Sequence, residues 1–175
     1  HTVFASLSKE AEQNCIVCTA PSKTFNLAGL QTSNLFIPNP KLLEKMRNFM
    51  GRLHYDQPNL AGLTACMAAY RGGASWLDEL IPYLAENVSL VRSFLRDHLP
   101  QLRLVEPEGT YLLWIDCRGL GLSQEELRKF FSERARLWVN EGEMFGPGGE
   151  GFVRVNIGCP RSVLQTALSR LSLHT

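Results

Sequence analysis

A short apolar run near the N-terminus constrains the fold of this chain more than any other feature. In residues 14–19, Asn-Cys-Ile-Val-Cys-Thr, apolar side chains occupy both odd and even positions. A strand with one solvent-facing side alternates apolar and polar residues, whereas a strand covered on both faces does not. We therefore expect a buried strand at 14–19, in an α/β domain whose helices cover both faces of a sheet.

The rest of the chain up to Pro100 offers too few strands to close such a sheet. The helix expected at 58–70 is apolar nearly all round, so we expect it to be buried. The other elements expected here are an extended stretch from Ser33 to Ile37, a helix at 42–50 stopped by Gly51, and a long helix with Ser75 as its N-cap and a kink or restart at Pro82. This region is typical of a piece of an α/β domain.

After Pro100 the pattern changes to a compact β-β-α-β-β-α unit. We expect strands at 102–105, 110–117, 136–140 and 152–158, a helix that begins with the capping box Ser123-Gln-Glu-Glu126, and a final helix from about 161. The loop Gly146-Pro-Gly-Gly149 lacks the ending of a phosphate-binding loop and is interpreted as a flexible turn. The expected division is therefore 1–72, a long connecting helix at 73–100, and a small α+β domain at 101–175.

Charge and cysteine content exclude several classes of function. The chain has 18 Lys+Arg and 17 Asp+Glu, a net charge of +1, which gives no electrostatic footprint for nucleic acid or an anionic membrane. No apolar run approaches the roughly 18 residues of a membrane span. Five scattered cysteines favour a reducing cytoplasm over a disulfide scaffold. Cys15 and Cys18 have CxxC spacing, but they lie within the expected strand and no second ligand pair is present, so no metal site is expected.

Lys23 is the first candidate for chemistry. It lies in a loop directly after the expected buried strand, between Ser22 and Thr24. A lysine that is desolvated at a strand end has a lowered pKa and a nucleophilic amine. The local sequence alone nevertheless favours a solvated loop lysine over one that forms a Schiff base.

Arg154 is the second candidate. In Phe152–Ile157 the period of two places Val153 and its alternate neighbours on one face of a strand, and Arg154 with Asn156 on the other. An arginine fixed on a strand can bind a carboxylate through two parallel hydrogen bonds. An ordinary charge on an exposed sheet face explains the pattern equally well, so both readings stay open.

Four segments together resemble a known family. Ala20-Pro-Ser-Lys-Thr-Phe-Asn-Leu-Ala-Gly-Leu30 resembles the cofactor-lysine segment of the fold-type-I pyridoxal-phosphate enzymes of the class I/II aminotransferase family. The family's downstream landmarks are similar to Trp76-Leu-Asp-Glu-Leu80, Glu108-Gly-Thr-Tyr-Leu-Leu-Trp-Ile-Asp116 and Phe152-Val-Arg-Val-Asn-Ile-Gly-Cys-Pro-Arg161. The resemblance implies the C-terminal part of a large cofactor-binding domain, over 1–72, followed by a small α+β domain.

The resemblance also implies roles for three residues. In the family, the lysine that matches Lys23 binds pyridoxal 5'-phosphate covalently and later moves the substrate Cα proton, and Ser22 is placed to help hold the cofactor phosphate. The arginine that matches Arg154 binds the α-carboxylate of a small amino-acid substrate. A homodimer is expected for the full-length protein.

Two departures from the family pattern favour one branch of it. Many aminotransferases have a phosphate-binding arginine eight residues after the lysine and a serine three residues before it, where this chain has Gln31 and Ala20. This version is similar to the cystathionine β-lyase-like C–S lyases, which eliminate a thiol from a sulfur amino acid and leave pyruvate and ammonia. Transfer of the amino group to a 2-oxo acid is the alternative.

The upstream part of the family's pocket is not in these residues. In the family, the aromatic residue that stacks on the cofactor, the aspartate on its ring nitrogen and the tyrosine on its phenolic oxygen precede the lysine, whereas only 22 residues precede Lys23. The chain therefore resembles the C-terminal half of an enzyme about twice as long. We expect it to be inactive alone, and a non-catalytic dimerising or regulatory role is the second alternative.

Overall fold

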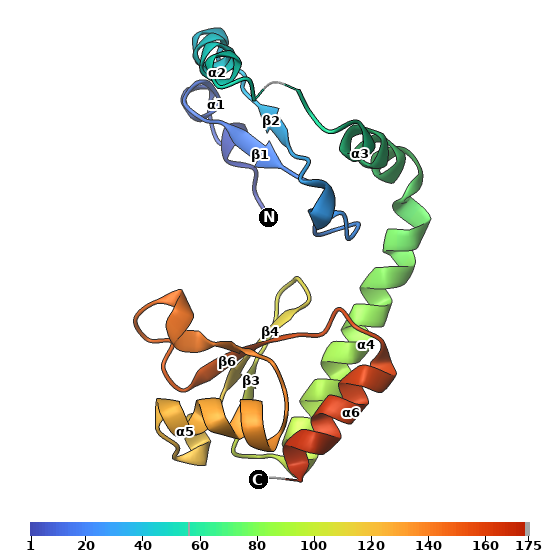
Figure 1. Cartoon of the computed structure of the whole chain (residues 1–175), viewed down its shortest axis with the longest axis vertical. Coiled ribbons are helices and arrows are strands. Elements are labelled where there is room, and N and C mark those ends of the chain that lie inside the picture. The colour runs from blue at the N-terminus through green and yellow to red at the C-terminus, as the bar shows by residue number, and fades with distance from the viewer. Residues whose placement is uncertain (56, 174–175) are drawn as a thin grey trace. The chain divides into compact units, whose positions relative to one another are not determined.

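The computed structural model describes residues 1–55 and 57–173, which form two compact units, His1–Glu79 and Leu80–Thr175. The fold is mixed α/β, as expected (Figure 1). Helix α4 (Ala74–His98) begins in the first unit and continues into the second, without a break at Pro82. Because α4 begins at Ala74, Ser75 lies within its first turn, and the prediction that Ser75 is the N-cap is wrong by two positions.

The described residues of the first unit form a two-stranded antiparallel sheet, three complete α-helices and the start of α4. Strands β1 (Val17–Thr19) and β2 (Asn34–Phe36) pair with Val17 opposite Phe36. The helices are α1 (Lys9–Gln13), α2 (Pro40–Arg52) and α3 (Leu60–Gly72), with 3-10 turns at Phe4–Ser6 and Ala28–Leu30. Asn39 and Asn59 cap α2 and α3 by accepting backbone N–H bonds. Gly51 does not stop α2, which continues one residue further.

Burial in the first unit differs from the sequence-based expectation. Strand β1 is only three residues long and half-buried to exposed, and α3 leaves Leu60 79% and Met67 50% exposed. Among the described residues of this unit, only Pro21, Gly62 and Cys66 are buried. The predictions of a strand covered on both faces and of a buried helix at 58–70 are therefore wrong for this chain. Their apolar composition has no covering layer within these residues.

The second unit is built on a four-stranded antiparallel sheet in the order β3-β4-β6-β5. The strands are β3 (Arg103–Val105), β4 (Leu112–Asp116), β5 (Asn140–Glu141) and β6 (Phe152–Asn156). The helices are α5 (Gln124–Lys129), which continues as a π-helical turn over Phe130–Arg134, and α6 (Arg161–Ser172), with 3-10 turns at Arg118–Leu120 and Gly142–Phe145. The β-β-α-β-β-α order is confirmed, as is the capping box from Ser123 to Glu126.

The prediction of a strand at 136–140 is largely wrong. Only Asn140 of the expected strand 136–140 is in β5. The backbone of Arg136 has φ +53°, which is left-handed, and the N–H of Leu137 donates to the carbonyl of Phe131 at 2.8 Å. The backbone N–H of Leu137 therefore bonds to the π-helical turn and is not available to pair with a neighbouring strand.

The hydrophobic core lies in the second unit. One face of the sheet contributes Leu113, Ile115 and Val153, all at most 4% exposed. Helices α4, α5 and α6 and the π-helical turn pack their apolar residues against it: Val91, Leu95, Leu127, Phe130, Phe131, Leu164, Leu168 and Leu171. The opposite face of the same strands carries the polar candidates.

The packing of α4 against the core leads to a prediction about the stability of two truncated polypeptides. Because Val91, Leu95 and Leu99 are each at most 2% exposed within this core, a polypeptide starting at residue 101 lacks three central side chains. Removing even one such leucine typically costs about 2–5 kcal/mol. We therefore expect residues 80–175 to unfold cooperatively in a thermal melt monitored by circular dichroism, and residues 101–175 to show no such transition. Equal melts for the two polypeptides would contradict this.

Candidate active site

Arg154 lies in the middle of β6, on the sheet face opposite the core. Its cross-strand neighbours are Trp114 of β4 on one side and Asn140 of β5 on the other. Directly opposed residues point to the same face of an antiparallel sheet, so the three side chains form a row. The prediction that Arg154 lies opposite a buried apolar face is confirmed, since Val153 is 1% and Ile157 is 0% exposed.

The guanidinium of Arg154 is half-buried and held by two contacts. Its Nη2 donates to Oδ1 of Asn140 at 3.1 Å, and its Cζ lies 4.4 Å from the ring centroid of Phe145. Its Nε is buried and has no hydrogen-bond partner among the described residues. Arg154 takes part in no ion pair with any described side chain. A half-buried cation with unmet donors suits a binding site for an anionic group.

A cluster of aromatic rings lies beside this arginine. Phe145 meets Trp114 edge-on, with centroids 5.6 Å apart, and Trp114 stacks on Phe152 at the same distance. The guanidinium of Arg118 covers Phe152 at 4.8 Å and is paired with Asp116 at 2.7 Å. This ion pair lowers the pKa of Asp116. Of these rings, Phe145 covers one face of the half-buried Arg154 guanidinium, and partial burial strengthens the interaction of a cation with a bound anion.

Charged side chains fix the short strand β5 to helix α5. Arg128 donates to Glu141 at 2.7 and 2.9 Å and to Glu143 at 2.9 Å. The hydrogen bonds from Arg128 hold the pKa of Glu141 below its ordinary value. Asn140 and Phe145, which the sequence analysis did not single out, lie beside these anchored residues, because Asn140 precedes Glu141 and the turn Gly142–Phe145 follows it.

The loop Gly146-Pro-Gly-Gly149 packs closely against this turn. A Cβ on Gly142 would lie 2.1 Å from the carbonyl oxygen of Gly149 and 2.9 Å from Cβ of Phe152. Backbone-to-backbone approach of this kind is possible only for glycine. The loop thus has a second role, beyond that of a turn, because it supports the segment that places Phe145 on Arg154.

This close approach predicts the effect of adding a methyl group. We expect Gly142→Ala to destabilise the protein by about 1–3 kcal/mol, because the backbone of Gly149 has to move. Gly121→Ala is unsuitable as a control, because Gly121 has a left-handed φ of +67°, a conformation that favours glycine. Gly109, with open space around it, is suitable. Chemical denaturation of both alanine variants tests the prediction, and equal midpoints would contradict it.

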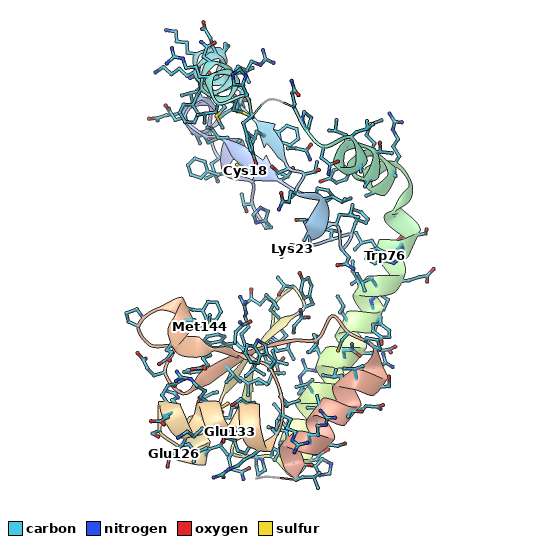
Figure 2. All side chains as sticks on the ribbon, viewed as in Figure 1. Cys18, Lys23, Trp76, Glu126, Glu133 and Met144 are labelled. Carbon is cyan, nitrogen blue, oxygen red and sulfur yellow. The ribbon has the colours of Figure 1, made fainter. Side chains whose placement is uncertain are left out.

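Lys23 lies in a turn that follows β1. The N–H of Phe25 donates to the carbonyl of Pro21 at 2.9 Å, and that of Leu27 donates to the carbonyl of Ser22 at 3.0 Å. Pro21 is buried and Ser22 is half-buried. Lys23, labelled in Figure 2, is exposed. The expected loop is confirmed, but the side chain is not desolvated within this chain. Lys23 makes no hydrogen bond or ion pair with the described residues.

The aromatic ring of Phe25 anchors this turn. It packs edge-on to Tyr70 at 6.2 Å and lies 5.9 Å from the ring of Trp76, centroid to centroid. A Cβ on Gly73 would lie 2.5 Å from the Phe25 ring, so the glycine between α3 and α4 allows this contact. Asn26 closes the turn with a left-handed φ of 55°, a conformation that asparagine tolerates. Lys23 and Ser22 thus belong to the first unit and Arg154 to the second, and each is held within its own unit.

The cysteines do not form a metal or disulfide site in the described part of the chain. Residues 1–55 and 57–173 contain no group of three His, Cys, Asp or Glu able to hold a metal ion. All five cysteines are free, with Cys18 exposed and Cys117 buried. Burial, and secondarily the charge of Asp116, raises the pKa of Cys117 to about 12.

This pKa predicts a selective reaction with thiol reagents. Because the thiolate is the nucleophile, we expect Cys117 to resist iodoacetamide at pH 8 while Cys18 is alkylated. Peptide mass mapping after brief treatment distinguishes the two. The prediction fails if Cys117 is modified as fast as Cys18, and treatment in denaturant, where both should react, is the control.

The comparisons with known proteins give the family. The family described as aminotransferase class I and II matches residues 2–171. The chain belongs to this family. Cystathionine beta-lyase PatB of Bacillus subtilis (strain 168) is 40% identical to it over 171 residues, which are 98% of this chain and 44% of PatB. Protein MalY of Escherichia coli (strain K12) is 34% identical over 94% of the chain and 42% of MalY.

A solved structure of a similar protein agrees with the fold. The crystal structure of cystalysin from Treponema denticola, which contains a pyridoxal 5'-phosphate cofactor, has a TM-score of 0.94 and 36% identity, over 99% of this chain and 44% of cystalysin. The expected fold-type-I architecture is thereby confirmed. The chain spans less than half the length of these relatives. In its described part, no helix is long and apolar enough to cross a membrane.

Proposed function

We propose that this chain supplies the lysine-bearing and carboxylate-binding parts of a pyridoxal-phosphate-dependent C–S β-lyase. The observation that carries the proposal is Arg154, a half-buried guanidinium that has no ion-pair partner among the described residues and lies on the sheet face opposite the core. The 40% identity between this chain and cystathionine beta-lyase PatB supports elimination of a thiol over transfer of the amino group. The substrate class is a small sulfur amino acid such as cystathionine.

The residues present fit the cofactor in the part of the site that this chain contains. Lys23 is exposed and unpaired among the described residues, so its side chain is accessible to a carbonyl cofactor, and the hydroxyl of the half-buried Ser22 is a donor for the cofactor phosphate. When bound, pyridoxal phosphate withdraws electrons from the substrate Cα and so makes its proton acidic. Gln31, where many relatives carry a phosphate-binding arginine, leaves the phosphate with fewer charged ligands from this chain.

The chain's own residues then have separate tasks. Arg154 binds and orients the α-carboxylate, and the amine of Lys23 accepts the Cα proton. The electron pair from the Cα–H bond forms a Cα–Cβ double bond while the Cβ–S bond breaks, and the sulfur leaves as a thiolate. Water then releases pyruvate and ammonia, so that cystathionine and water give homocysteine, pyruvate and ammonia.

The experiment that tests this proposal separates it from the aminotransferase alternative. Removal of the Cα proton is common to both reactions, so the products decide. We expect the full-length protein to release pyruvate from cystathionine without a 2-oxo acid. Amino transfer that depends on an added 2-oxo acid, without pyruvate release, would overturn the lyase assignment.

A non-catalytic role predicts a different result. A dimerising or regulatory protein of the same fold has no need for cofactor on Lys23. Borohydride reduction of the full-length protein, followed by peptide mapping, is expected to find the cofactor on the peptide that contains Lys23. Failure of this trapping would favour the non-catalytic alternative.

We further propose that the full-length enzyme is a cytoplasmic homodimer. The five free thiols support a reducing compartment, and the family assignment supports a dimer. Light scattering coupled to size-exclusion chromatography of the full-length enzyme tests the assembly.

We expect residues 1–175 alone to be inactive. The described part of the first unit leaves large apolar side chains exposed, among them Leu60, Tyr70 and Phe36, and such surfaces are normally covered by a partner. The groups that the family places on the other side of the cofactor ring are expected from a different segment. Incubating the purified chain with pyridoxal phosphate and cystathionine is expected to give no pyruvate, and robust turnover would contradict this.

A further inference from the structure

A row of three side chains crosses the sheet at Arg154. Trp114, Arg154 and Asn140 are directly opposed on β4, β6 and β5, so they share one face. Asn140 is the outermost of the three and its Oδ1 accepts a hydrogen bond from Nη2 of Arg154 at 3.1 Å. The edge of the guanidinium is therefore fixed by an uncharged acceptor.

The contacts of Arg154 leave one direction for a ligand. Phe145 covers a face of the guanidinium at 4.4 Å, and Nε is buried. Nη2 has two hydrogens, of which Asn140 takes one, and Nη1 makes no hydrogen bond with the described residues. The Nη1 and Nη2 end of the group is thus the part that remains for two parallel hydrogen bonds to a carboxylate.

We propose that Asn140 is a positioning residue that orients Arg154 for end-on binding of the substrate carboxylate, an inference that rests on the carboxylate role proposed above for Arg154. The amide suits this task because it accepts a hydrogen bond without neutralising the charge. A carboxylate in its place would form an ion pair with Arg154 and compete with the substrate. An apolar residue would leave the guanidinium free to rotate away from the productive orientation.

The anchoring of β5 shows why Asn140 can hold this orientation. Its neighbour Glu141 is held by two hydrogen bonds from Arg128, at 2.7 and 2.9 Å, and pairs with Val153 in the ladder. Asn140 therefore lies on a strand that is fixed to both α5 and β6. A side chain on such a fixed strand positions its partner more precisely than one on an unsupported loop.

The test compares two substrates that differ only in the group that Arg154 binds. S-methylcysteine has an α-carboxylate, and S-methylcysteine amide has an uncharged carboxamide but keeps the same amine and the same thiol leaving group. Release of methanethiol gives kcat and KM for both in the full-length enzyme. The variants are Asn140→Ala, Asn140→Asp, Arg154→Lys and, as a matched control for the added charge, Gln165→Glu on the exposed face of α6.

We expect Asn140→Ala to raise KM for S-methylcysteine by about tenfold, as loss of a hydrogen bond to a charged group implies, with kcat little changed. Asn140→Asp, which is nearly isosteric, should raise this KM further. Neither variant should alter KM for the amide, and Gln165→Glu should alter neither KM. Because a folding defect would affect both substrates equally, the difference between them isolates the orienting role.

Two results would overturn the inference, and a third would overturn the proposed function instead. If Asn140→Asp behaves like the parent enzyme, or if both Asn140 variants change KM for the two substrates equally, Asn140 does not orient Arg154 for the carboxylate. If Arg154→Lys leaves the preference for S-methylcysteine over its amide unchanged, then Arg154 is not the carboxylate ligand. Thermal melts of each variant identify any loss of folding.

Discussion

Replacing Lys23 with alanine in the full-length enzyme is expected to lower the rate of pyruvate release from cystathionine by at least about a hundredfold, the lower end of what a positioned general base contributes. The structure indicates that the turn that carries Lys23 does not depend on the lysine side chain. The turn Pro21–Asn26 is held by its own backbone hydrogen bonds and by the packing of Phe25 on Tyr70 and Trp76. The substitution therefore removes the amine and leaves its support in place.

The control for this prediction is another exposed lysine. Lys41 lies in the first turn of α2 and is exposed, like Lys23. Lys41→Ala removes the same side chain from the same unit, and it should leave pyruvate release unchanged. Normal turnover by the Lys23→Ala enzyme, or equal losses in the two variants, would remove Lys23 from the mechanism.

Local signals in the sequence predict the second unit well. The capping box at Ser123 and the alternation in Phe152–Asn156 each correspond to an element with the expected ends or faces. Both signals act over a few residues, since a cap bonds to its own helix and a period of two gives the buried face directly. The two-faced character of β6, on which the candidate role of Arg154 depends, could therefore be predicted from the sequence.

Burial in the first unit could not be predicted in the same way. The sequence pattern of β1 and α3 indicates coverage on all sides, whereas Leu60 is 79% and Leu63 40% exposed. Apolar composition shows that a side chain favours burial, but it does not show which segment covers it. The described residues of this unit contain too few layers to provide that cover.

The surroundings of Arg154 depend on contacts between distant residues. Asn140 and Phe145 reach Arg154 only because β5 pairs with β6 in a particular register and a 3-10 turn then folds back. No short-range pattern contains that register, and the expected strand at 136–140 would have placed Asn140 at its end. The glycines at 142 and 149, whose backbones approach closely in the structure, are the local signal that could have drawn attention to this turn.

Arg154→Ala is the second variant with a large expected effect. Because the guanidinium is half-buried and Phe145 covers one of its faces, the substitution removes a carboxylate partner that water replaces poorly. Truncating one member of such a buried charge pair costs about 2–5 kcal/mol of binding free energy. We expect this loss in the affinity for α-amino acids, measured as the dissociation constant of a slowly reacting cysteine S-conjugate in the full-length enzyme.

Arg161 is the instructive comparison, because it is also an arginine near the end of β6 but has a different set of contacts. Its Nη2 pairs with Glu86 at 2.6 Å, its Nε donates to the buried Asn87 at 3.2 Å, and its Cζ lies 4.9 Å from the ring centroid of Tyr83. These contacts join the start of α6 to α4, so Arg161→Ala should lower the melting temperature more than Arg154→Ala and affect amino-acid affinity less. If instead Arg154→Ala left affinity unchanged and Arg161→Ala abolished it, the carboxylate ligand would be Arg161. The ion pairs argue for the opposite result, because Arg161 is paired with Glu86 whereas Arg154 has no carboxylate partner among the described residues.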